Sequence, residues 1–275
     1  MRRPTVVLIS LISAAVLSGC AESRPANTPP VATSDAPLAA LPADQVVFSY
    51  DDGVGGPTAY PDYVANATDF AIYGDGRVFR VAEYGVSYEM ATIDPLAVAE
   101  FAAQVDKSGL IDDAVDYGDP KITDGSSTRV TFEAGEGSRS ISVYLLRMDD
   151  VNVSGPQQDN RDDLVDLLEE ADQLAEGAAP VPTERLQIVQ FDPWNDSGPQ
   201  WPGPDLATFL TPADDNKFAI SCGVVAGPGT AAITDLMSQT AAPHQFDYHW
   251  IYAGTVYGLV PRALLPGERE CARIN

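Results

Sequence analysis

The segment 69–81, which reads DFAIYGDGRVFRV, constrains the fold more than any other stretch of the chain. Two runs rich in β-branched and aromatic residues flank the glycine-containing turn 74–76. A short turn of this kind between such runs predicts an antiparallel hairpin, because glycine supplies the positive φ that the turn requires. Residues 128–134 and 138–146 repeat the pattern around a second turn, 135–137. Two local hairpins therefore predict an antiparallel sheet.

Two amphipathic segments follow the hairpins. With Asp94 as N-cap, apolar residues recur at helical spacing as far as Gly109, which is expected to end the first helix. A second helix is expected to begin at Asp159 or Asn160 and to close at Gly177. The connections are too short for parallel crossovers, so we expect an antiparallel sheet with helices on one face.

The N-terminus has the pattern of an export signal. Arg2 and Arg3 precede an uncharged apolar run over residues 5–18, shorter than the about 20 residues of a bilayer span. The run leads into residues 17–20 (LSGC), which resemble the lipobox of bacterial lipoproteins. This resemblance implies cleavage before Cys20 and a diacylglyceryl group on its sulfur, with further acylation of its amine. A coincidental cysteine in an ordinary signal peptide or membrane anchor is the alternative.

The charge of the chain argues against one class of partner. It holds 40 acidic and 16 basic residues, a net charge of −24, and two of the basic residues fall in the expected signal peptide. Nucleic acid is not expected, because phosphate binding needs a basic face. Anionic headgroups repel the same surface, so the lipid must hold the protein at the membrane. Scarce lysine beside abundant Ala, Gly, Pro, Val and Asp is typical of a GC-rich genome, which with the lipobox suggests an actinobacterium.

The predicted fold class is α+β: two small antiparallel-sheet domains with helices packed on one face, after a disordered Pro-rich tether. The second domain should contain strands around 185–191 and 217–225, a helix over 230–239 and a hairpin over 246–260. The expected divisions are a lipoprotein signal peptide (1–19), a lipidated tether (20–44), an α+β domain (45–177), a linker (178–184) and a small disulfide-closed α+β domain (185–275).

The first domain also resembles an uncharacterised domain family of bacterial secreted proteins and lipoproteins. The resemblance is carried by YGDGRVF, DKSGLID, ITDGSSTRVTF and LVDLLEEADQL. It implies an extracytoplasmic α+β fold, and it brings no activity and no site residue.

Cysteine and histidine define the remaining chemistry. Once Cys20 is lipidated, Cys222 and Cys271 form an even pair outside the cytoplasm, for which a disulfide is the expected state and free buried thiols are the alternative. Asp247 and His249 alternate onto one side of a predicted strand, where an Asp–His pair could orient a general base. No motif nominates a serine to complete that site, and a hydrogen-bonded or partly exposed histidine is the simpler interpretation.

We therefore predict no catalytic residues, no cofactor and no metal site. Four acidic loops lack the alternating ligand spacing of an EF-hand. They contain Asp51 and Asp52; Asp112 and Asp113; Asp149, Asp150 and Asn152; and Asp192, Asn195 and Asp196.

Trp194 and Trp201 are the candidate ligand-binding residues, because they stand among Pro and Gly in one loop. Large amphipathic rings in such a loop can contact a protein or stack on a sugar. Alternatively, they fold over the core as a lid. We expect a lipid-anchored, non-enzymatic binding or scaffolding protein of the cell envelope, with an envelope protein or a glycan as candidate partner. A hydrolase that uses Asp247 and His249, and a calcium-dependent adhesin or ligand carrier, are the alternatives.

Overall fold

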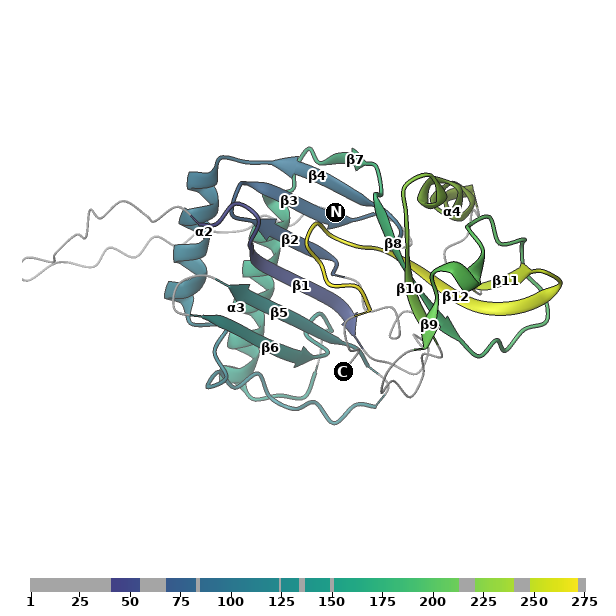
Figure 1. The fold of residues 1–275 in the computed structure, drawn as a ribbon. Helices are drawn as coiled ribbons and strands as arrows, with labels where there is room; N and C mark the ends of the chain where they lie inside the picture. Colours follow the sequence, from purple (N-terminus) through teal and green to yellow (C-terminus); the bar gives the residue numbers. More distant parts are fainter. Residues whose placement is uncertain are drawn as a thin grey trace, which may run out of the picture. The chain divides into compact units, whose positions relative to one another are not determined.

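The computed structural model describes residues 41–54, 68–82, 85–123, 125–133, 137–148, 151–212, 221–239 and 248–271. They belong to a compact unit that spans Leu38–Asn275. Within them the chain forms two antiparallel sheets and three α-helices, which confirms the predicted α+β class (Figure 1). The expected signal peptide, Cys20 and nearly all of the tether lie outside these residues, as do His244 and Asp247.

The larger sheet contains both predicted hairpins. Its strand order is β6-β5-β1-β2-β3-β4-β7. In the β2–β3 turn, Gly76 has a φ of 92°, and a Cβ placed there would lie 2.1 Å from the carbonyl oxygen of Ile93. Only glycine fits this turn. The strands are β1 (Val46–Val54), β2 (Phe70–Tyr73), β3 (Arg77–Val81), β4 (Tyr88–Thr92), β5 (Ser127–Glu133), β6 (Ser138–Tyr144) and β7 (Ala179–Val181).

Two helices cover one face of this sheet, α2 (Pro95–Ser108) and α3 (Gly155–Gln173) (Figure 1). The N-cap of α2 is Asp94, whose carboxylate accepts from the Leu96 N–H, as predicted. Their apolar stripes pack on the sheet around Phe48, Ile72 and Val130, all buried.

The boundaries of α3 differ from those predicted. It begins at Gly155, because Ser154 and Gln157 form a capping box one turn before the expected start. It ends at Gln173, before Gly177. Local turns that link Ala171, Asp172 and Gln173 to the residues after them replace the last helical turn.

The smaller sheet has the strand order β11-β12-β8-β10-β9. A short 3-10 helix (Leu206–Thr208) lies between β8 and β9, and α4 (Pro228–Gln239) follows β10. The predicted strand 185–191 matches β8 at both ends. The other strands are β9 (Thr211–Pro212), β10 (Ser221–Ala226), β11 (His249–Tyr252) and β12 (Thr255–Ala263).

The two sheets share a hydrophobic core. Phe79 and Tyr88 of the larger sheet pack in one cluster with Ile188 and Leu259 of the smaller sheet. The Tyr88 hydroxyl also donates to the carbonyl of Ala263, at 3.2 Å. The expected linker contains β7, which pairs with β4. The division into a domain over 45–177 and a domain over 185–275 stays a prediction.

A disulfide joins Cys222 on β10 to Cys271, as the sequence predicts. It fixes the end of residues 264–271, here called the C-terminal segment. In Figure 1 this segment, in yellow, runs over β1 and β2, and the Tyr73 hydroxyl on β2 donates to the carbonyl of Pro266 at 2.8 Å. Among the residues that the structure describes, no helix is both long enough and apolar enough to cross a membrane.

Candidate functional site

The two candidate tryptophans have different environments. Trp201 is 7% exposed and belongs to the core between the sheets, where its ring meets Trp250 edge-on at 5.1 Å. Its indole N–H donates to the carbonyl of Pro204 at 2.8 Å. Trp194 is 55% exposed and stacks on Phe191 at 4.9 Å. Only Trp194 therefore offers a ring to a partner.

His249 supports the Trp194 loop. It is 2% exposed, and its Nε2 accepts a hydrogen bond from the backbone N–H of Trp194 at 3.1 Å. A lone pair used in this way cannot take a proton from a serine. The strand begins only at His249, after Tyr248 with a φ of 49°, so the alternation predicted for residues 246–252 starts there. Asp247, the other half of the predicted pair, lies outside the described residues.

The described residues of the acidic loops form no cluster of metal-ligating side chains. Within the part of the chain that the structure describes, no group of three or more His, Cys, Asp or Glu side chains could hold an ion. Asp52 instead accepts from the Thr128 hydroxyl at 2.6 Å and pairs with Arg147 at 2.7 Å. Asp149 and Asp150 lie outside the described residues.

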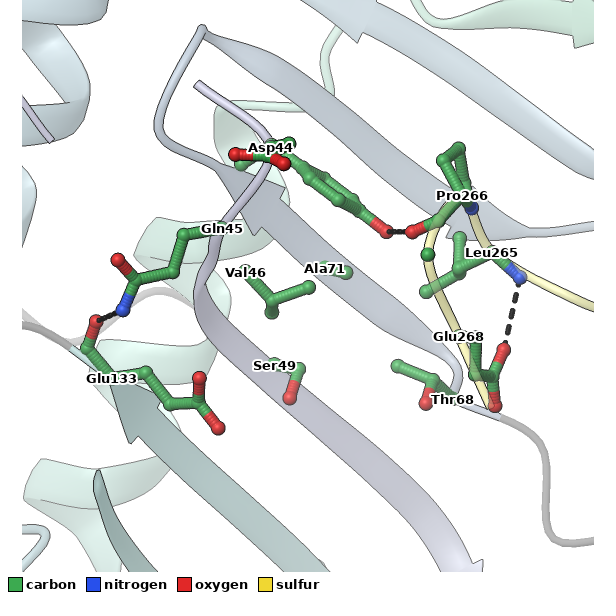
Figure 2. A pocket seen from close by; sticks show the side chains of 12 residues that line it. Asp44, Gln45, Val46, Ser49, Thr68, Ala71, Glu133, Leu265, Pro266 and Glu268 are labelled. Atoms are coloured by element: carbon green, nitrogen blue, oxygen red, sulfur yellow. Dashed lines mark hydrogen bonds between the residues drawn. The ribbon is translucent and has the colours of Figure 1, made fainter. Parts of the chain in front are cut away.

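The first cavity has a volume of about 360 Å³ and lies between β1, β2 and the C-terminal segment. In Figure 2, Glu133 and Glu268 stand on opposite sides, with Ser49 and Thr68 between them. Gln45 donates to the carbonyl of Glu133 at 2.7 Å. Glu268 accepts from the backbone N–H of Leu265 at 2.9 Å and from the Arg262 guanidinium at 2.6 Å, so its carboxylate fixes the wall of the cavity.

Two carboxyl groups near the ends of β1 and β2 have raised pKa values, although neither lines this cavity. Burial raises the pKa of Asp51 to about 6, although Arg129 and Arg262 act in the opposite direction. Burial also raises the pKa of Asp69 to about 7, against a hydrogen bond from the Asp52 N–H at 2.5 Å. Raised carboxyl pKa values are common at functional sites, although structural networks produce them as well.

The second cavity has a volume of about 350 Å³ and lies on the other side of residues 263–266. Its floor comes from β3 and β4, and its walls come from residues 181–185 and from β12 with the residues after it. It is lined mainly by apolar side chains, with Arg77 and Arg185 among the lining residues. Tyr73 lines the first cavity, and the Arg77 guanidinium lies 4.8 Å from the centre of the Tyr73 ring.

Neither cavity was predicted from the sequence. Both depend on where the C-terminal segment crosses the larger sheet, which is a long-range contact. The one local signal was the cysteine pair, which predicted that Cys271 is fixed to Cys222.

Comparison of the chain with protein-family models, with curated proteins and with solved structures found no match. The resemblance of the first domain to a family of secreted proteins therefore stays a prediction. The functional argument rests on the residues of this chain alone.

Proposed function

We propose that this protein is a membrane-anchored lipoprotein outside the cytoplasm that binds a small ligand without transforming it. The observation that carries the binding function is the pair of preformed cavities along the C-terminal segment, each within the range of about 300–1,000 Å³ that is usual for ligand sites. The residues 17–20 (LSGC) support the anchor. The disulfide supports an oxidising location, since such bonds are rare in reducing compartments.

Binding is favoured over hydrolysis by the position of His249. Its Nε2 is occupied by the Trp194 N–H and its ring is buried under Trp194, so it offers no base to an incoming substrate. No described observation favours the calcium-dependent alternative.

Metabolic labelling with an alkynyl fatty acid tests the anchor. We expect the wild-type chain to be labelled and to sediment with membranes, and Cys20→Ala to lose both properties. Cys271→Ala is the matched control, because it removes a different cysteine and should keep the label. Equal labelling of the wild type and Cys20→Ala would overturn the proposal that a lipid at Cys20 anchors the protein.

A further inference from the structure

The second cavity combines an apolar floor with two arginines, Arg77 and Arg185, among its lining residues. Phe79, Tyr88 and Met90 form the floor, and Val181 and Leu264 stand at its sides. A surface of this kind removes alkyl or aryl groups from water, and each square ångström of apolar area that it covers contributes roughly 25 cal/mol. The floor therefore suits the apolar part of a small molecule.

Arg77 gives the cavity its charge. Its Nε pairs with Asp75 at 2.7 Å, and its guanidinium lies over the Tyr73 ring, so the group is held in place from two directions. Its two terminal amino groups make no hydrogen bond or ion pair to any residue that the structure describes. A guanidinium that is fixed through Nε presents these amino groups to a carboxylate with little loss of entropy.

The other charged residues at this cavity are already engaged or exposed. Arg185 pairs with Glu270, and its other amino group is 3.5 Å from the carbonyl oxygen of Glu268. Glu184 is exposed on the rim. Arg77 is therefore the basic residue of this cavity whose terminal amino groups are not engaged by a described residue.

We propose that the second cavity binds a small amphiphilic carboxylate, whose carboxylate group is held by Arg77 and whose alkyl or aryl part lies on Phe79, Tyr88 and Met90. This inference rests on the proposed binding function and names its ligand class. Asp75 acts as the positioning residue for the guanidinium. The volume of about 350 Å³ limits the ligand to a small molecule.

Isothermal titration of the full-length chain in non-ionic detergent tests the proposal with two probes of the same shape. 3-Phenylpropanoate carries the charge, and 3-phenylpropanamide is its neutral counterpart. We expect the wild type to bind the carboxylate at least about tenfold more tightly, as one charge-assisted hydrogen-bonded pair predicts. Arg77→Gln should lose this preference and keep its affinity for the amide, which also reports that the cavity is still folded.

Arg80→Gln is the matched control, since Arg80 lies on the same strand but on the opposite face and pairs there with Glu89. It should keep the preference of the wild type. Met90→Trp fills the floor and should weaken both probes. Equal affinity of the wild type for the two probes, or an unchanged preference in Arg77→Gln, would overturn the ligand class. Binding of both probes with equal affinity would still support the binding function, so failure of the ligand class is distinguishable from failure of that function.

Discussion

Asp69 immediately precedes β2, and burial raises its pKa from 3.8 to about 7. Asp51 shifts in the same direction for the same reason. When the pKa of a carboxyl group is higher in the folded protein than in the unfolded chain, ionisation of that group destabilises the folded protein relative to the unfolded chain. Its contribution to stability is therefore complete below pH 3.8 and is lost as the pH rises through the folded value.

Asp69→Asn tests this effect. The amide oxygen can still accept from the Asp52 N–H, but the side chain cannot ionise. We expect the variant to gain stability relative to the wild type between about pH 4 and pH 7, where the wild-type carboxyl loses its proton. Urea unfolding at pH 4, 5.5, 7 and 8 measures the difference. Asp163→Asn, at an exposed position on α3, is the control. A constant difference between Asp69→Asn and the wild type across this range would contradict the prediction.

At the scale of the elements, Arg161 fixes α3 to the end of the larger sheet. It is 1% exposed, and its guanidinium donates to the carbonyls of Tyr117 (2.9 Å), Tyr144 (2.8 Å) and Leu145. These carbonyls come from the segment after α2 and from the end of β6, so one side chain joins three pieces of chain. Burial also lowers the pKa of Arg161 from its ordinary value.

Arg161→Met replaces this guanidinium by an apolar side chain of similar length. The carbonyls of Tyr117 and Tyr144 lose this donor inside the protein, whereas the Leu145 carbonyl still accepts from the Met148 N–H at 3.2 Å. Because each unsatisfied acceptor costs about 1–3 kcal/mol, we expect a loss of about 2 kcal/mol or more. Guanidinium chloride unfolding measures it. Arg80→Met removes an exposed arginine and its surface ion pair with Glu89, and should cost less than about 1 kcal/mol. Similar losses of unfolding free energy in the two variants would contradict the proposed role of Arg161 in fixing α3 to the sheet.

The elements that the sequence predicts well are those with local signals. Gly76 immediately precedes β3, and Asp94 immediately precedes α2, as the sequence predicts. The start of α3 was placed one turn late, because its capping box at Ser154 precedes the apolar stripe.

Features that depend on distant contacts were not predictable in this way. Trp194 and Trp201 occupy the same kind of loop, and only packing against Trp250 from another strand buries one of them. Likewise, β7 has no periodicity of its own, and its pairing with β4 comes from a distant part of the sequence. Both cavities belong to this second group.

At the scale of the whole molecule, the disulfide connects residues 49 positions apart and ties the end of the C-terminal segment to β10 of the smaller sheet. Closing a loop of this length removes chain entropy from the unfolded state, which stabilises the folded protein by about 4 kcal/mol in the loop-entropy model. The segment makes further contacts through Glu268 and Pro266.

The double variant Cys222→Ala/Cys271→Ala should therefore unfold at a lower denaturant concentration than the oxidised wild type, by the equivalent of about 4 kcal/mol. Denaturant unfolding with and without a thiol reductant measures this. Reductant should shift the wild type toward the double variant and leave the double variant unchanged. A wild type that is insensitive to reductant, although reduction of its cystine is confirmed by mass spectrometry, would contradict the prediction.

The disulfide at the end of the C-terminal segment also bears on the walls of both cavities. The same strip of backbone is a wall of both cavities, and in the thiol form nothing covalent keeps that strip in place. Without the disulfide, non-covalent contacts such as the hydrogen bond from Tyr73 to the Pro266 carbonyl hold this wall alone.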